Sequence, residues 1–331
     1  MKSPTHPRHI VAVLFRRVGD SLMATPALRA VKECFPEVRF QVVCEQHVMR
    51  VFEGNGAIDD IVTISSPPSV RQQLRAIRAY GRPDVVLDFL SDPRSAIACF
   101  LSGARQRIGF AYPGRRWAYT RVVSLQDPVH PVYSVEHKLS LAQTLGCGST
   151  LIQTDFSLNE ADRHFAQEQW RRRNWDDTTR VAVFFIHSRR VYKRWPVERF
   201  RELVDRVTAE RLARPLILAT PGDQEAISAL QRRGILPSES FLAVDDIGRL
   251  GAVLKRCRIL IGNDGGPKHI AVALDVPTLT IFGKESVEFW TPPHSSRHVA
   301  LNADRRRGDL WVSTSDVFEA LQKMLDSTAN P

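Results

Sequence analysis

The chain has 331 residues, which is long for a single hydrophobic core and favours two domains. With 43% hydrophobic and 25% charged residues, its composition is typical of a globular protein and argues against a disordered chain. The formal net charge of +10 predicts an attraction to anions, but it leaves nucleic acid, phosphorylated small molecules and an anionic membrane surface open.

The cysteines and the first apolar run narrow the class of protein further. The five cysteines show no CxxC pair and no spacing with histidine that would suggest a zinc site. Because their number is odd, we expect buried, reduced thiols in a cytoplasmic protein. The apolar run at residues 10–15 ends at Arg16 and Arg17 and is too short for a signal peptide or a membrane span. We interpret it as a strand.

The first half of the chain alternates apolar, β-branched runs with helical patterns. Strands are expected at residues 9–15, 39–45, 59–64 and 84–89, and helices at 20–35, 70–80 and 94–103. Apolar strands separated by helices of this length indicate parallel strands covered on both faces. A stretch rich in loops follows at about 109–131, and then two helical patterns at 136–146 and 160–174.

The alternation begins again after the polar segment 174–179, which we interpret as a linker. Strands are expected at 180–188, 215–220, 258–263 and 278–282, and helices at 197–210, 223–233, 247–257 and directly after residue 264. Two such halves predict an α/β protein of two Rossmann-like domains whose parallel sheets face each other across a cleft. The expected domains are residues 1–173 and 174–331, and the last helix, 315–327, could pack on either one.

One turn in the second half carries polar residues between two buried strands. Residues 261–283 read IGNDGGPKHIAVALDVPTLTIFG. Gly265 and Gly266 have no side chain to block a ligand, and the N–H groups of the helix start, together with Lys268, favour a phosphate. The alternative is that the glycines only allow a tight turn and that Asp264 caps the helix. His269 lies beside the turn, although a lone histidine is more often part of the core.

This stretch resembles the sequence pattern of glycosyltransferase family 9, the ADP-heptose:lipopolysaccharide heptosyltransferases. The family carries a pattern like G-N-D-[ST]-G-P-x-H, and the matching residues here are Gly262, Asn263, Asp264, Gly266, Pro267 and His269. Gly265 departs from the pattern, because the family usually has a hydroxyl there that bonds the nucleotide's phosphate. The resemblance implies a GT-B type fold and a nucleotide-sugar site that includes Asp264, Gly265, Gly266 and His269.

A second stretch, residues 14–36, resembles the N-terminal signature of the same family. The matching residues are Gly19, Asp20, Thr25, Pro26, Ala27, Leu28 and Arg29. For Asp20 the resemblance implies the role of catalytic base, and a carboxylate that follows the first strand of such a sheet suits this role. The alternative is that Asp20 is only the N-cap of a helix.

A third stretch, FIHSRRVYKRWPVERF, resembles the family's strand followed by a K-x-W-P motif, with Lys193, Trp195 and Pro196 in register. The resemblance implies that Ser188 meets phosphate and that Lys193 neutralises the departing diphosphate. The alternative is an exposed basic run. In the later segment LATPGDQEAI, Glu225, or failing it Asp223, would hold the ribose hydroxyls, although either could simply begin a helix.

The resemblance implies an inverting glycosyltransferase with ADP-heptose as donor and a phosphorylated lipopolysaccharide core as acceptor. No D-x-D pair is present to hold a metal on the diphosphate, so we expect neither metal nor cofactor. The candidates to touch the anionic, membrane-anchored acceptor are Arg16, Arg17, Arg115 and Arg116, although each such arginine is more often a solvated charge. We expect a cytoplasmic protein, peripheral to the inner membrane.

Two other classes of function compete with transfer. Gly265, and the GKES sequence at 283–286 where the family usually has G-P-T, fit a catalytically silent nucleotide-sugar-binding protein. Members of the family also use other sugars or acceptors. Charge alone suggests nucleic-acid binding, but the chain has no recognisable helix-turn-helix, zinc finger or aromatic-basic sheet motif. We therefore expect no nucleic-acid partner.

Overall fold

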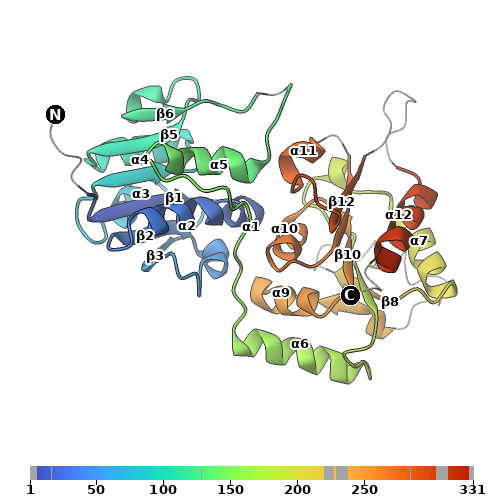
Figure 1. Cartoon of the computed structure of the whole chain (residues 1–331). Helices are drawn as coiled ribbons and strands as arrows, with labels where there is room; N and C mark the ends of the chain where they lie inside the picture. The colour runs from blue at the N-terminus through green and yellow to red at the C-terminus, as the bar shows by residue number, and fades with distance from the viewer. Residues whose placement is uncertain are drawn as a thin grey trace. The chain divides into compact units, whose positions relative to one another are not determined.

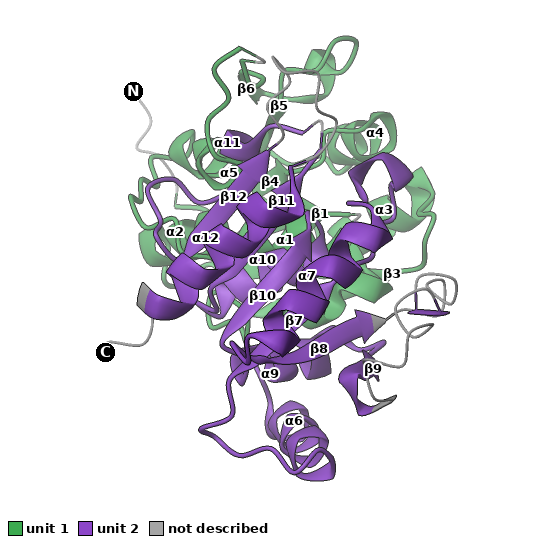
Figure 2. Cartoon of the chain, turned by 90° about the vertical axis from the view of Figure 1, so that its right-hand side faces the viewer, with its two compact units in different colours: residues 1–157 green, residues 158–331 purple. Residues whose placement is uncertain are grey.

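The chain forms two compact units, residues 1–157 and 158–331, seen in Figure 1 and coloured separately in Figure 2. The computed structural model describes residues 6–15, 17–127, 129–219, 227–228, 238–283, 285–302 and 312–327. Within these residues each unit holds one parallel sheet of six strands with helices on both faces. The expected α/β class and the two Rossmann-like sheets are thus confirmed.

The first sheet has the strand order β3-β2-β1-β4-β5-β6, and every neighbouring pair is parallel. Its strands are β1 (His9–Leu14), β2 (Arg39–Glu45), β3 (Asp60–Ile64), β4 (Val85–Asp88), β5 (Gln106–Phe110) and β6 (Arg121–Val123). The helical segments are α1 (Val18–Leu22), α2 (Thr25–Cys34), η1 (Gln46–Val51), α3 (Val70–Ile77), α4 (Pro93–Leu101), η2 (Arg116–Ala118) and α5 (Ser134–Gln143). Helix α2 packs beside α5, and α3 beside α4.

The central strand β1 explains why helices must cover both faces of this sheet. All six of its residues are buried, and Ile10, Val11, Ala12 and Val13 expose no surface. Successive side chains of a strand point to opposite faces, so an unbroken apolar run needs cover on both sides. The apolar sequence of the strand therefore determines a three-layer unit.

The second sheet has the order β12-β11-β10-β7-β8-β9, again parallel throughout. Its strands are β7 (Val181–Phe185), β8 (Arg214–Ala219), β9 (Phe241–Ala243), β10 (Ile259–Asn263), β11 (Thr278–Phe282) and β12 (His298–Asn302). The helical segments are α6 (Glu160–Arg172), η3 (Val191–Lys193), α7 (Val197–Ala209), η5 (Ser238–Ser240), α9 (Ile247–Lys255), α10 (Gly266–Ala273), α11 (Val287–Trp290) and α12 (Thr314–Ser327). The last helix, α12, packs on α7 in this unit.

The division between the units lies before helix α6, earlier than the expected boundary after residue 173. Ser157 is tied to the first unit, since its Oγ donates to Gly54 O at 3.0 Å and its carbonyl accepts from Arg50 at 3.0 Å. Asn159 caps α6 by accepting from the backbone N–H of Asp162. Helix α6 then packs on α9, so it belongs to the second unit.

Several elements differ from the sequence-based expectation. Strands β5, β6, β9 and β12 were not expected, and the helix expected over 20–35 is divided into α1 and α2. At the division Thr25 Oγ1 donates to Leu22 O at 2.7 Å, so the side chain bonds the end of the preceding helix. The helix expected over 223–233 lies outside the described residues apart from 227 and 228.

Candidate functional site

In the second sheet, the chain leaves β7 and β10 in opposite lateral directions, and the candidate site lies where these two neighbouring strands end. In doubly wound sheets ligands bind at the carboxyl ends of the strands beside such a change of direction. The expected strand, turn, helix and strand over 261–283 are confirmed as β10, α10 and β11. The loop after β7 and the turn after β10 therefore meet at the place where a ligand is expected.

The side chain of Asn263 holds these two segments together. Its Nδ2 donates to Ile186 O at 2.7 Å, and its Oδ1 accepts from the backbone N–H of Trp195 at 2.9 Å. Asn263 is 1% exposed, so both bonds lie in the interior. Trp195 is also buried, and its Nε1 donates to Val312 O at 3.0 Å. Asn263 thus holds together Ile186 and Trp195, which stand at the two ends of the loop that carries Ser188 and Lys193.

Asp264 lies at the centre of a buried cluster of charges. Its Oδ2 is 2.9 Å from Lys193 Nζ, and its Oδ1 is 3.0 Å from Lys268 Nζ and 3.8 Å from His269 Nε2. Burial opposes ionisation of Asp264, but Lys268, His269 and Lys193 outweigh it and hold the pKa of the carboxyl well below its usual value. The structure thus brings together three of the expected nucleotide-site residues: Lys193, Asp264 and His269.

Lys193 also contacts Glu285, which the sequence reasoning did not find. Lys193 Nζ lies 3.2 Å from Glu285 Oε1, and although burial lowers the pKa of Lys193, Asp264 and Glu285 raise it above its usual value. Two carboxylate oxygens here are buried and accept no hydrogen bond of good geometry from the described residues: Glu285 Oε2, and Asp264 Oδ1, which is still ion-paired with Lys268 at 3.0 Å. They can accept from the hydroxyl groups of a ligand.

The turn between β10 and α10 is held by glycines rather than by a side-chain cap. Gly265 is the N-cap residue of α10 in an extended conformation, and no side chain caps the helix. The alternative that Asp264 is a cap is therefore wrong, because its carboxylate pairs with lysines instead. Gly266 is the first helical residue, and its N–H has no partner within the helix. A backbone donor at a helix start, beside Lys193, suits an anion.

Gly262 shows how closely β10 approaches β7. Its φ is +158°, and a β-carbon there would lie 2.2 Å from Phe185 O. A side chain at this position would push the two strands apart, and with them the loop and the turn that they carry. The glycine is thus required by the backbone and not by a ligand.

Lys268, which was expected to help attract an anion, is turned inward. It is 2% exposed, and its ammonium donates to Trp290 O at 2.6 Å besides pairing with Asp264. Burial lowers its pKa, against the effect of Asp264. We conclude that Lys268 supports Asp264 and that Lys193 is the better placed of the two lysines for a ligand.

Asp20 lies at the corresponding place in the first unit, where the strand order changes direction between β1 and β4. The N-cap of α1 is Arg17, without a side-chain cap, and Asp20 lies in the first turn of the helix, so the N-cap alternative is wrong. Its side chain is 40% exposed and its Oδ1 lies 3.9 Å from Lys138 Nζ. Burial lowers the pKa of Lys138, which Asp20 partly offsets. This pairing across α1 and α5 was not visible in the sequence.

Two other residues of the N-terminal motif have structural roles. Thr25 Oγ1 accepts from the backbone N–H of Asp155 at 2.8 Å. Arg29 pairs with the carboxylate of Asp155 at 2.5 Å and donates to Gln153 O at 2.8 Å. These bonds fix the segment that leads out of the first unit, so part of the motif serves the fold.

The remaining candidates are not brought together by the described structure. Arg17 and Arg116 are exposed, whereas Arg115 is partly buried and donates to Ser91 O at 3.3 Å. Ser188 is 5% exposed on the closed loop. Arg16, Asp223 and Glu225 lie outside the described residues. The expected acceptor and ribose contacts therefore stay predictions.

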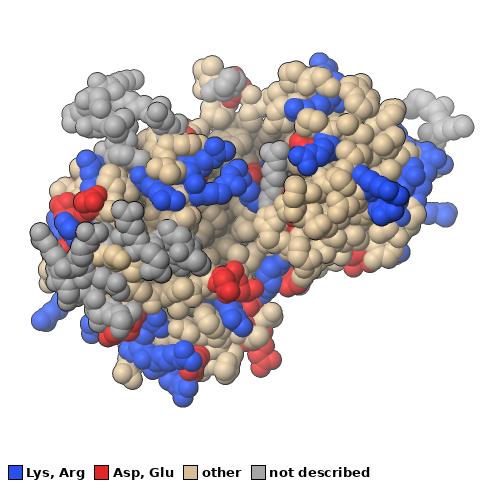
Figure 3. Space-filling view, turned by 180° about the vertical axis from the view of Figure 1, so that it is seen from behind, with Lys and Arg blue, Asp and Glu red and all other residues tan. Residues whose placement is uncertain are grey.

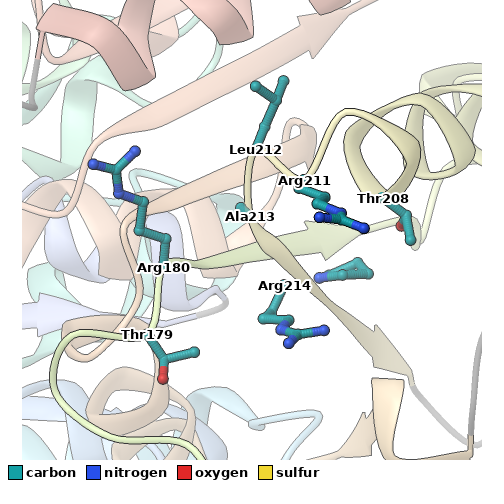
Figure 4. A pocket seen from close by; sticks show the side chains of 8 residues that line it. Thr179, Arg180, Thr208, Arg211, Leu212, Ala213 and Arg214 are labelled. Atoms are coloured by element: carbon teal, nitrogen blue, oxygen red, sulfur yellow. The ribbon is translucent and has the colours of Figure 1, made fainter.

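A pocket of about 640 Å³ lies at the opposite end of the second sheet and contains none of the candidate residues. It is lined at the starts of β7 and β8 by residues that include Arg180, Arg211 and Arg214, as Figure 4 shows. A ligand of a doubly wound sheet belongs at the other ends of the strands. Among the described residues no group of three or more His, Cys, Asp or Glu side chains could hold a metal ion.

Comparison with known proteins agrees with this geometry. Residues 69–312 match the family model described as glycosyltransferase family 9 (heptosyltransferase). Lipopolysaccharide heptosyltransferase 3 of Escherichia coli is 23% identical over 344 residues, which cover 94% of this chain and 97% of that protein.

Two solved structures share the fold over nearly the whole chain. The glycosyltransferase family 9 protein of Veillonella parvula superposes with a TM-score of 0.86 at 22% identity, covering 97% of this chain and 98% of that one. E. coli heptosyltransferase WaaC with ADP gives a TM-score of 0.68 at 19% identity, and the match covers 97% of this chain and 98% of that one. The chain belongs to glycosyltransferase family 9, the heptosyltransferase family, and is a glycosyltransferase with two Rossmann-like units.

Proposed function

We propose that this glycosyltransferase moves a heptose from ADP-heptose to a phosphorylated lipopolysaccharide core, with inversion at the sugar carbon and without a metal ion. The observation that carries the proposal is the Lys193–Asp264 pair at the carboxyl end of the second sheet. A relative that matches over nearly its whole length is named a lipopolysaccharide heptosyltransferase, and a structural neighbour was solved with ADP. Both support the donor and acceptor classes proposed here.

The donor's diphosphate would bind between Lys193 and the first turn of α10. Lys193 supplies a positive charge, and Gly265 and Gly266 leave room for backbone N–H groups to approach phosphate oxygens. The buried Glu285 Oε2 would accept a hydrogen bond from a sugar hydroxyl, and so would Asp264 Oδ1, which Lys268 neutralises without a hydrogen bond of good geometry. A nucleotide sugar offers both kinds of group, since its phosphates are acceptors and its hydroxyls are donors.

The reaction would be a single displacement. The acceptor hydroxyl oxygen forms a bond to C1 of the heptose while the bond from C1 to the diphosphate oxygen breaks. Asp20 takes the proton of the hydroxyl, and ADP leaves with the electron pair of the broken bond. Lys193 offsets the charge that develops on the leaving phosphate, which is the part that a metal ion plays in other transferases.

The acceptor would be recognised through its negative charge. The chain carries a formal charge of +10, and Arg17 and Arg116 are exposed in the first unit. No helix in the described part of the chain is long and apolar enough to cross a bilayer. We therefore propose contact with the membrane from the cytoplasmic face, without a span.

The test is release of ADP from ADP-heptose by the full chain, with and without a core acceptor. Release that requires the acceptor and persists in EDTA supports metal-independent transfer. Binding of ADP-heptose without release would identify a silent nucleotide-sugar-binding protein instead. A rate that EDTA abolishes and Mg²⁺ restores would contradict the metal-free mechanism, and release with another nucleotide sugar would change the donor.

A further inference from the structure

After Arg94, which is exposed, helix α4 of the first unit presents apolar side chains on its exposed face as well as on its buried one. Ala96, Ala98 and Cys99 are buried, yet Ile97 is 37% exposed and both Phe100 and Leu101 are 46% exposed. A surface helix usually presents polar residues to water, and a helix that is apolar all round normally has cover on every side. The outer face of the last two turns of α4 is therefore a candidate docking surface.

The exposed face of α4 continues onto the 3-10 helix η2. The ring of Trp117, which is 56% exposed, meets the ring of Phe100 edge to face at 5.2 Å between centroids. We define the α4–η2 patch as the side chains of Ile97, Phe100, Leu101 and Trp117. Two aromatic and two aliphatic side chains from separate segments thus form one apolar surface.

The segment that carries this patch is rich in arginine and poor in acidic residues. Residues 61–126 contain ten Arg, no Lys, no Glu and three Asp. All three aspartates are engaged: Asp84 accepts from backbone N–H groups of residues 8 and 9, Asp88 is fully buried, and Asp92 caps α4. The segment that carries the patch therefore has an excess of positive charge.

Individual contacts place guanidinium groups at the edges of the patch. The Arg107 guanidinium lies 5.6 Å from the centroid of the Phe100 ring. At the end of α4, Arg78 donates to Leu101 O at 2.7 Å. Arg105 and Arg116 are exposed and adjoin the patch along the chain. Over the chain as a whole, in line with its net charge of +10, Lys and Arg form several separate groups on the face drawn in Figure 3.

We propose that the α4–η2 patch docks on an anionic lipid bilayer, with Trp117, Phe100 and Leu101 entering the interface and the arginines meeting phosphate headgroups. Aromatic side chains favour the membrane interface, and each nearby cation adds to the attraction of an anionic surface. The inference rests on the proposed function for its purpose, since the acceptor there is a membrane lipid, and it locates the membrane contact on the first unit.

A second copy of the chain is the less favourable occupant. Two copies related by a twofold axis would bring the same patch, and therefore the same arginines, against each other. Because residues 61–126 carry ten Arg and only three Asp, such a contact would bring like charges together. A bilayer containing anionic lipid matches both the apolar centre and the positive edge.

The experiment is sedimentation of the full chain with vesicles of phosphatidylcholine, and with vesicles in which part of it is replaced by phosphatidylglycerol. No donor or acceptor is present, so the result is independent of catalysis. We expect binding to the anionic vesicles that weakens as salt is added. Trp117→Ala and Leu101→Asn should each reduce the partition coefficient about tenfold or more, the value of one buried apolar side chain.

Matched variants distinguish binding through the patch from binding through exposed hydrophobic or basic side chains elsewhere on the protein. Leu151→Ser removes a hydrophobe that is 54% exposed outside the patch and should bind like wild type. Arg105→Gln should weaken binding to anionic vesicles about fivefold, the value of one cation near such a surface, whereas Arg171→Gln in α6 should not. Equal binding to both vesicle types, no binding, or patch variants that bind like wild type would each overturn the proposal.

A dimer is the remaining outcome. If the full chain forms dimers in solution that Trp117→Ala dissociates, the patch is an interface between copies and the proposal is wrong. If the wild-type chain transfers heptose to a soluble acceptor but does not bind the anionic vesicles, the docking surface is wrong and the proposed function stands. If the chain binds the anionic vesicles but transfers no heptose, the proposed function is wrong and the docking surface stands.

Discussion

Gly265 lies directly against the ring of Phe185: a β-carbon at Gly265 would come within 3.1 Å of Phe185 Cε1. The family's usual hydroxyl residue at this position would therefore press on Phe185. The glycine that this chain has in place of the family's usual hydroxyl residue thus lies against Phe185, the last residue of β7.

We predict that Gly265→Ser alone does not improve ADP binding and lowers the melting temperature, because the serine overpacks Phe185 at a cost of about 1 kcal/mol or more. In a Phe185→Leu background, the same serine should fit and strengthen ADP binding. Calorimetric titration and melting of the four proteins of this double-mutant cycle measure the coupling. Additive effects of the two substitutions would show that the glycine and the ring are independent.

We predict that Lys193→Ala weakens ADP binding about 10- to 100-fold, the value of one charged hydrogen bond, and leaves adenosine binding nearly unchanged. Adenosine lacks the phosphates that the ammonium would meet. The control is Arg189→Gln, which removes a neighbouring exposed cation of the same loop. Should adenosine binding fall as much as ADP binding, Lys193 would matter for folding of the loop and not for phosphate.

We predict that Asp20→Asn reduces turnover about 10²- to 10⁴-fold, the usual effect of losing a positioned base, with ADP binding unchanged. Its melting temperature should fall only modestly: Asp20 caps no helix and its side chain is 40% exposed, but the buried Lys138 loses a nearby negative charge. Initial rates of ADP release and thermal melting test both parts. Turnover within a few-fold of wild type would remove Asp20 from the mechanism.

We predict that Asn263→Ala destabilises the second unit by about 2 to 4 kcal/mol, because two buried hydrogen bonds are lost and Ile186 O and Trp195 N–H are left unpaired. Asn263→Asp should be comparably harmful, since an acceptor would replace the donor facing Ile186 O. Denaturant unfolding measures the loss. A stable Asn263→Asp protein would show that the loop can close without this donor.

We predict that the protein loses stability as the pH falls from about 6.5 to about 4. Burial lowers the pKa of His298 to about 4, with a further contribution from Arg297, so the unfolded chain binds a proton before the folded chain does. The free energy of unfolding should fall by on the order of 1 kcal/mol per pH unit in that range.

His298→Gln should reduce this pH dependence, whereas His130→Gln, at an exposed histidine, should not. Burial also lowers the pKa of His9 and His137, so part of the slope should persist in His298→Gln. Denaturant titrations at several pH values give the slopes. An unchanged slope in His298→Gln would contradict the assignment.

The central strands and the turn after β10 could be predicted because their signals are local. β1 and β10 are continuous apolar runs, and the turn carries two glycines and Pro267. The edge strands β6 and β9 were missed because each has three residues and a partly exposed surface, which gives no periodic signal.

The contacts of the site could not be predicted, because they join residues far apart in the sequence. Asn263 lies 77 residues from Ile186, and Lys193 lies 71 residues from Asp264. Lys268 illustrates the opposite error: a lysine in the first turn of a helix suggests an exposed cation, and here it is buried against a carboxylate. Sequence motifs identified the participants, whereas their pairing required the fold.

The ties on either side of Leu158 leave very little free chain between the two units. Ser157 is bonded to Gly54 and Arg50, and two residues later Asn159 already caps α6. Few backbone dihedral angles are therefore left free in this connection. Insertion of residues beside Leu158 would add free backbone at a point where the chain now passes directly from the hydrogen bonds of one unit to the helix cap of the other.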